Sequence, residues 1–114
     1  MRSRSAEHDR GSVTAEFAVA LPAIALVLAA CLGSVHLVAQ QVRLTDAAAD
    51  AARALGRGET SAVAESIAMR VSGGARMAVA EDSMFVCVTL SANGAGVLSS
   101  VGLEAESCAV TAGR

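Results

Sequence analysis

An uncharged apolar run extends from Phe17 to Ala39 and contains no Asp, Glu, Lys or Arg. As an α-helix, its 23 residues would be about 35 Å long, because each residue adds a rise of ~1.5 Å. The hydrocarbon core of a bilayer requires about 20 such residues. The pattern therefore predicts a membrane-spanning helix at about residues 17–39.

The helical pattern continues beyond the apolar run, because QQVRLTDAAADAARAL keeps strong helix formers until Gly56 and Gly58. We therefore predict one N-terminal helix over residues 12–55, half within the membrane and half outside it. Four apolar residues recur at helical spacing in the outer half, and we expect this seam to pack on the C-terminal part of the chain. The seam consists of Leu44, Ala48, Ala51 and Leu55.

After this helix the pattern changes first to a shorter helix and then to strands. ETSAVAESIAMRVSGG has apolar residues at helical spacing between a capping Thr60 or Ser61 and the pair Gly73-Gly74. ARMAVA and SMFVCVTLS then alternate with a period of two, as half-buried strands do, and GLEAESCAVT alternates less cleanly. We predict an exported α+β domain over residues 56–114, with a short second helix and a small antiparallel sheet of about three strands.

The composition argues against nucleic-acid binding. The 114 residues carry a formal net charge of −2, so no basic patch is expected. The aromatic residues are Phe17 and Phe85 alone, which leaves no platform on which bases would stack.

Catalytic and metal-binding chemistry also finds little support in the sequence. The two histidines are His8, in the N-terminal tail, and His36, near the end of the apolar run. The exported domain therefore has no histidine from which to build a nucleophilic or a zinc site. No phosphate-binding loop is present either. We expect a structural protein without a cofactor or a metal, not an enzyme.

The charges before the apolar run predict the orientation in the membrane. Arg2, Arg4 and Arg10 precede the run, and basic residues close to a span favour the cytoplasmic side, whereas acidic residues count for little. We therefore predict a cytoplasmic N-terminus and an exported C-terminal domain.

The three cysteines differ in their predicted surroundings. Cys31 lies in the apolar run, whereas Cys87 and Cys108 fall on predicted strands of the exported part, where an oxidising compartment permits disulfides. If these strands are antiparallel, pairing the two cysteines centres their connection on residues 97–98, inside the Gly/Ser-rich stretch SANGAGVLSSVG. A disulfide closing a loop of about 22 residues would stabilise the domain by roughly 3 kcal/mol. We predict this disulfide, with two free buried thiols as the alternative.

Three interpretations of the N-terminal region give different starts of the mature chain. A cleaved secretory signal would have an apolar stretch of about 7–15 residues, shorter than this run. Leu28-Ala29-Ala30-Cys31 matches a lipobox, in which Cys31 would be acylated, although LGSVHLVA continues the apolar helix where a polar tether is usual. The third interpretation depends on Gly11 and Glu16. Apart from these three, an uncleaved single-span anchor would keep Met1.

The stretch GSVTAEF, from Gly11 to Phe17, followed by AVALP, resembles the TadE-type pseudopilins of the Flp (tight adherence) type IV pilus system. Such proteins are cut on the cytoplasmic side after a Gly, and they have a Glu at the fifth residue of the mature chain. The resemblance implies that residues 1–11 are a leader peptide removed by a prepilin peptidase. Ser12 would then be the first mature residue and Glu16 the fifth.

The resemblance also implies a role in assembly. Glu16 would pair with the amino group of Ser12 of a neighbouring subunit, although an ordinary acid in a first helical turn is the simpler interpretation. Pro22 removes the backbone hydrogen bond to Ala18, and either a harmless kink or a role in packing or membrane extraction would follow. The implied partners are other pilin subunits, the pilus assembly platform and membrane lipid. We expect a minor pilin or pseudopilin, with the lipoprotein or the uncleaved anchor as the alternative.

Overall fold

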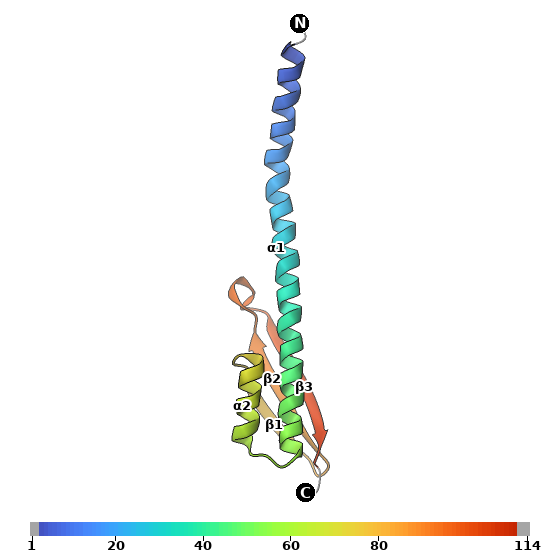
Figure 1. Cartoon of the computed structure of the whole chain (residues 1–114), viewed down its shortest axis with the longest axis vertical. Coiled ribbons are helices and arrows are strands. Elements are labelled where there is room, and N and C mark those ends of the chain that lie inside the picture. The colour runs from blue at the N-terminus through green and yellow to red at the C-terminus, as the bar shows by residue number, and fades with distance from the viewer. Residues whose placement is uncertain (1–2, 112–114) are drawn as a thin grey trace. The chain divides into compact units, whose positions relative to one another are not determined.

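The computed structural model describes the backbone of residues 3–111 and the side chains of residues 10–111. Two helices precede a three-stranded antiparallel sheet, so the predicted α+β fold is confirmed (Figure 1). The chain divides into two compact units, Met1–Val35 and His36–Arg114. The elements are α1 (Ser3–Gly56), α2 (Ser61–Ser72), β1 (Arg76–Glu81), β2 (Phe85–Asn93), the 3-10 turn η1 (Gly96–Leu98) and β3 (Gly102–Val110).

The first unit consists of the N-terminal part of α1. This helix begins at Ser3, before the predicted start at residue 12, and it runs without interruption through Pro22. Its apolar side chains are exposed, with 77% of Val19 and 73% of Leu26 accessible. By length and composition, α1 is apolar enough from Arg10 onward to cross a bilayer, and none of the most apolar stretch is buried. The helix therefore fits a single-pass membrane protein.

In the second unit, local signals fix both ends of α2. The hydroxyl of Thr60 accepts a hydrogen bond from the amide of Val63 at 3.3 Å, which satisfies one unpaired donor at the helix start. At the other end, Gly73 adopts a left-handed conformation with φ of 82°, and its amide donates to the carbonyl of Met69 at 2.9 Å. The capping residues predicted from the sequence thus lie at the helix ends.

The sheet has the strand order β1-β2-β3, so every strand pairs with its neighbour in sequence. In the central strand, Val88 lies between Val79 of β1 and Ser107 of β3. Alternate residues of β2 are buried, namely Val86, Val88 and Leu90, and the residues between them face away from the helices. The predicted period of two is therefore confirmed for this strand.

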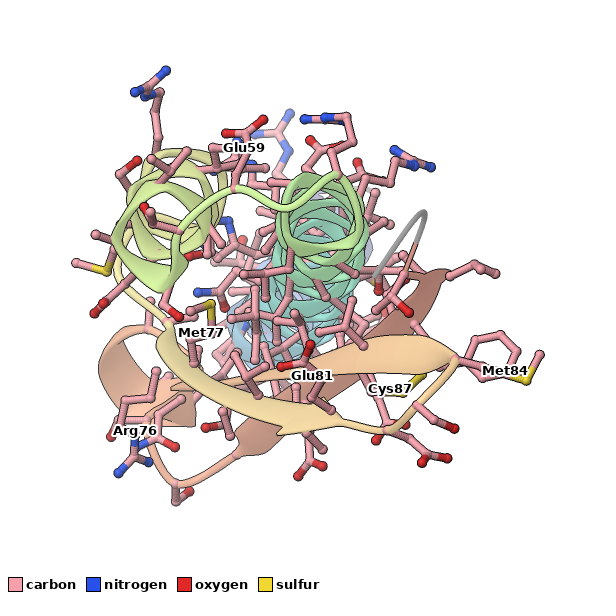
Figure 2. The ribbon with its side chains drawn as sticks, turned by 90° about the horizontal axis from the view of Figure 1, so that it is seen from below. Glu59, Arg76, Met77, Glu81, Met84 and Cys87 are labelled. Carbon is pink, nitrogen blue, oxygen red and sulfur yellow. A yellow bond between two sulfur atoms is a disulfide. The ribbon has the colours of Figure 1, made fainter. Side chains whose placement is uncertain are left out.

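Both helices lie on the same side of the sheet, and the core forms between them and β2 (Figure 2). The predicted seam of α1 is buried in this core, with Leu44 and Leu55 at its ends. The other buried positions of α1 are small, which allows the helix backbone to approach the sheet closely. The fully buried alanines of α1 are Ala47, Ala48, Ala51, Ala52 and Ala54.

Two contacts show that β3 runs alongside α1 in the same direction. The side-chain amide Nε2 of Gln41 donates to the carbonyl of Glu104 at 2.9 Å. Farther along, a Cβ placed on Gly56 would lie 2.8 Å from the carbonyl oxygen of Val110, so only glycine fits this contact without a shift. From Gln41 to Gly56 the helix rises about 22 Å, and from Glu104 to Val110 the strand rises about 20 Å. The two segments are therefore nearly equal in length and lie side by side from one contact to the other.

Cys87 of β2 and Cys108 of β3 are directly opposite each other in the sheet. Their Cα atoms are 4.0 Å apart, and the structure joins the two residues in a disulfide. Because Val86 and Val88 point into the core, the disulfide lies on the outer face of the sheet. Cys31 is exposed on α1 and carries a free thiol.

We expect the substitution Ala51→Leu to destabilise the second unit by about 1–3 kcal/mol, because overpacking would push α1 away from β2. Ala51 is fully buried, whereas Ala62 is exposed at the start of α2, so Ala62→Leu is the matched control. Hydrogen exchange of the β2 amides should become faster by roughly tenfold or more in Ala51→Leu, since about 1.4 kcal/mol corresponds to a factor of ten. Exchange as slow as in the unmodified protein would contradict the close packing.

We expect Cys87 and Cys108 to be bonded to each other in the protein isolated from membranes, with Cys31 reduced. Peptide mapping after alkylation should then find label on Cys31 without reductant, and on the other two cysteines only after reduction. Cys31 serves as the internal control for complete alkylation. Label on all three cysteines before reduction would be the opposite result.

Candidate processing and assembly site

The residues predicted for processing and assembly lie on consecutive turns of α1, all within its first unit. Gly11 has open space around it, since a Cβ built there would meet no atom within 4 Å. Ser12 and Glu16 are four residues apart on the helix, and side chains at that spacing are neighbours on one face. Both are exposed, and so is Phe17, with 63% of its surface accessible. The structure thus presents the whole motif on the helix surface.

Glu16 borders a shallow surface depression lined by small and apolar side chains. The depression follows one face of the helix, with Ser12 and Glu16 at one end and Ala23 at the other. Ala15, Val19 and Ala20 complete its lining. A helix surface with such small side chains leaves room for close approach by another helix.

The carboxylate of Glu16 forms no ion pair with the side chains of residues 10–111. In the sequence it is the one charged residue between Arg10 and Arg43. Among the side chains that the structure describes, the ion pairs are Arg53–Asp50 and Arg57–Glu59, and Glu16 takes part in neither. A counter-charge for Glu16 would therefore have to come from outside these described side chains, for example from another molecule.

The Gly11–Ser12 peptide bond lies inside the helix, since α1 begins at Ser3. The hydroxyl of Thr14 also donates to the carbonyl of Arg10 at 3.0 Å, across this bond. A protease that binds an extended chain would have to unwind these turns. Gly11 favours unwinding, because glycine in a helix interior costs about 1 kcal/mol relative to alanine.

Several predicted features of the N-terminal tail lie outside the description. Residues 1 and 2, and so Arg2, fall outside the described backbone, and the side chains of Arg4 and His8 fall outside the described side chains. The basic flank therefore stays a prediction from the sequence.

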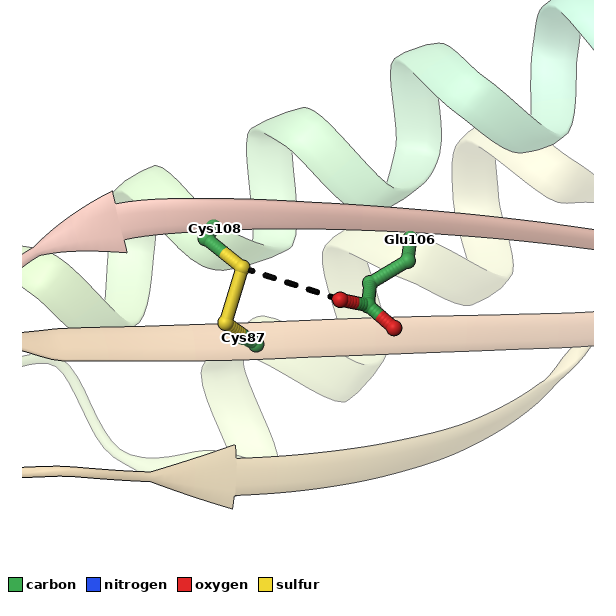
Figure 3. A group of neighbouring side chains, drawn as sticks. All are labelled: Cys87, Glu106 and Cys108. Atoms are coloured by element: carbon green, nitrogen blue, oxygen red, sulfur yellow. Dashed lines mark hydrogen bonds between the residues drawn. A yellow bond between two sulfur atoms is a disulfide. The ribbon is translucent and has the colours of Figure 1, made fainter.

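The two sulfurs of the disulfide and the carboxylate of Glu106 form a group of possible metal donors on the outer face of the sheet (Figure 3). One donor atom of Glu106 and the sulfurs of Cys87 and Cys108 lie within 4.8 Å of one another. The sulfur of Cys108 is 3.9 Å from the carboxylate oxygen Oε1 of Glu106 (Figure 3). A disulfide sulfur carries neither a proton to donate nor the negative charge that makes thiolate a metal ligand. In the oxidised form this group is therefore a contact between side chains and not a metal site.

The sequence did not reveal how the loop between β2 and β3 is built. The Gly/Ser-rich stretch SANGAGVLSSVG predicted a connection there, but not its shape or its side-chain exposure. In the structure this loop is internally hydrogen-bonded, and Val97 at its tip is 97% exposed. The run of uncharged residues around Val97 is the sequence feature from which the exposed apolar tip could have been predicted.

Comparison with known proteins places the motif in a family. Residues 11–53 match the family model described as TadE-like protein. A protein of Mycobacterium tuberculosis (strain ATCC 25618 / H37Rv), named "Apoptosis inhibitor Rv3655c", is 42% identical over 81 residues. The aligned part covers 68% of this chain and 62% of that protein, which is less than two thirds of its length. No solved structure matches the chain.

The family match begins at Gly11 and contains the other four residues predicted for processing and assembly. These residues are Ser12, Glu16, Phe17 and Pro22. The match ends at residue 53, shortly before the end of α1, and leaves α2 and the sheet outside it. The resemblance is therefore confirmed, and the chain is TadE-like over residues 11–53.

Proposed function

We propose that this protein is a minor pilin or pseudopilin that takes part in assembling a tight-adherence type IV pilus. The observation that carries the proposal is the TadE-like match, which begins at Gly11 and runs along the exposed apolar helix. The TadE-like family suggests a protein associated with the Tad pilus. An assembly role fits the first unit of α1, whose large apolar side chains are exposed in the structure.

The first step of the proposed function is cleavage after Gly11 by a prepilin peptidase. Hydrolysis of the Gly11–Ser12 bond leaves a carboxylate on the leader and a protonated amine on Ser12. The leader of residues 1–11 is removed, and the mature helix begins one turn before Glu16. The exposure of Gly11 and the weak helix propensity of glycine support this step.

The second step is docking through Glu16. A carboxylate at the boundary of a membrane span is tolerated better than one at the bilayer centre, where the cost is at least roughly 2.5 kcal/mol. When subunits pack side by side, the amine of Ser12 on one chain and the carboxylate of Glu16 on the next would neutralise each other. The isolation of Glu16 from the described cations supports a partner in another chain.

The proposed location follows from the same helix. We infer a single span at about residues 17–39, with the N-terminus in the cytoplasm and the second unit exported. The disulfide on the outer face of the sheet agrees with an oxidising compartment for that unit. The platform of the pilus machinery, other pilin subunits and membrane lipid are the proposed partners.

Substituting Gly11→Leu should block cleavage, because a branched side chain next to the bond would not fit a narrow peptidase site. We expect the uncut precursor, longer by the 11-residue leader, to accumulate in the membrane. Ala23→Leu places a leucine on the same helix away from the bond and should be cleaved normally. Intact mass measurement of the protein from membranes reads out both variants.

Substituting Glu16→Ala should separate assembly from insertion. The apolar run is unchanged, so we expect the variant to insert and to be cleaved, while its incorporation into pili falls. Loss of the counter-charge at a buried amine can cost a few kcal/mol, reduced where water reaches the pair. Glu65→Ala, which removes an exposed carboxylate from α2, is the control and should assemble normally. Equal incorporation of the two variants would argue against the docking role.

Substituting Cys31→Ala tests the lipoprotein alternative. If Gly11 is the processing residue, this variant should mature normally, since Cys31 is an exposed side chain in the middle of α1. If the lipobox is used, Cys31→Ala should abolish maturation and Gly11→Leu should be silent. The mature N-terminus of each variant, determined by mass spectrometry, distinguishes the two, and the second pattern would overturn the pilin assignment.

A further inference from the structure

The loop between β2 and β3 presents an apolar tip to its surroundings. Val97 is 97% exposed, the largest exposure among the large apolar side chains of the described residues, and Val101 is 37% exposed. The loop is also part of an uncharged stretch, since no Asp, Glu, Lys or Arg occurs between Asp82 and Glu104. Transfer of an exposed valine from water to an apolar environment is favourable, and an uncharged loop adds no charge that would oppose the transfer.

The loop is built to hold this tip in place. The amide of Gly94 donates to the carbonyl of Val101 at 2.9 Å, which closes the neck of the loop. Inside it, the amide of Leu98 donates to the carbonyl of Ala95 at 3.1 Å, and Gly96 takes a positive φ of 60°. A Cβ on Gly94 would overlap the carbonyl oxygen of Leu98, so the backbone passes itself more closely than other residues allow. The exposure of Val97 is therefore a property of a defined turn.

The position of the loop follows from the contacts between β3 and α1. Glu104 is level with Gln41, because its carbonyl accepts from the Gln41 side chain. The strand begins at Gly102, two residues before Glu104, which is about 7 Å closer to the N-terminal end of α1. On the helix, the same distance corresponds to roughly four residues. The loop therefore starts near the level of Leu37, among the last residues of the uncharged apolar run. Figure 1 shows it projecting beyond the ends of the strands of the second unit.

We propose that the tip of this loop, centred on Val97, inserts into the membrane interface beside the end of the transmembrane helix. This inference rests on the membrane location given under the proposed function. The occupant is a lipid surface, because the loop begins where the apolar run of α1 ends, and uncharged apolar side chains at that level meet the boundary between headgroups and acyl chains. The loop and the helix thus form two attachments of the second unit to the same bilayer.

The chain has no Trp and no Tyr, so a single introduced tryptophan reports its own surroundings. Three full-length variants are compared in nanodiscs that hold one copy each. Val97→Trp probes the loop, and Leu28→Trp marks the apolar run. Met84→Trp is the matched control, because Met84 is 62% exposed and its carbonyl accepts from Thr111, at the opposite end of the sheet. The lipid is phosphatidylcholine, either unmodified or a mixture brominated near the headgroup end and near the methyl end of its acyl chains, so that bromine lies close to residues at the interface and at the bilayer centre.

We expect brominated lipid to reduce the fluorescence of Val97→Trp by an amount comparable to that of Leu28→Trp, and to leave Met84→Trp unchanged. Quenching of Leu28→Trp alone would overturn the loop insertion and leave the span intact. Quenching of Val97→Trp and Met84→Trp to the same extent would also overturn it, because the domain would then lie flat on the lipid. No quenching in any variant would overturn the membrane span and the loop insertion together. Mapping of the Cys87–Cys108 disulfide in each variant checks that the sheet has folded.

Discussion

The second unit depends on the close approach of α1 to the central strand β2. Val88 and Leu90 of β2 are fully buried, and the helix meets them with alanines, whose single methyl groups keep the two backbones near each other. Three strands without a covered apolar face would be marginally stable in water. On the same side of the sheet α2 adds its own buried alanines, Ala64 and Ala68, so two helices together complete the core. The outer half of α1 is therefore part of this unit and more than a stalk that carries it.

Sequence periodicity predicted most of the secondary structure, because helix and strand patterns are local. The seam through Ala48 and Ala51 and the alternation along β2 both follow from side-chain direction alone. Contacts between distant segments were not predictable in this way: the hydrogen bond between Gln41 and Glu104 joins residues 63 positions apart. The seam predicted that the outer half of α1 packs on the C-terminal part of the chain, but the boundary between the two units at residue 36 had no local signal, since α1 continues without a break. The candidate site was predicted from the spacing of Gly11 and Glu16, but its counter-charge belongs to no described side chain.

One helix meets two different environments along its length. The first unit exposes apolar side chains around the helix, whereas the second unit buries a narrow alanine-rich face and leaves charged residues such as Arg53 in solvent. Large exposed apolar surfaces mark contact with a membrane or another protein. Glu16 adds one charge near the start of this apolar surface. When two helices pack side by side, a single charged residue fixes their alignment along the helix axis more sharply than apolar contacts do.

The parallel course of β3 and α1 also constrains the order of folding. Residues 41–56 of α1 are made early, whereas the strand that runs alongside them, from Glu104 to Val110, is the last of the described elements to be made. Closing the contact between Gln41 and Glu104 requires a long loop to form, and such non-local contacts are slow to form. The hairpins of the sheet are local and can form without waiting for α1. The side of α1 that faces β3 therefore stays uncovered until β3 has been made, and docking of this strand completes the core.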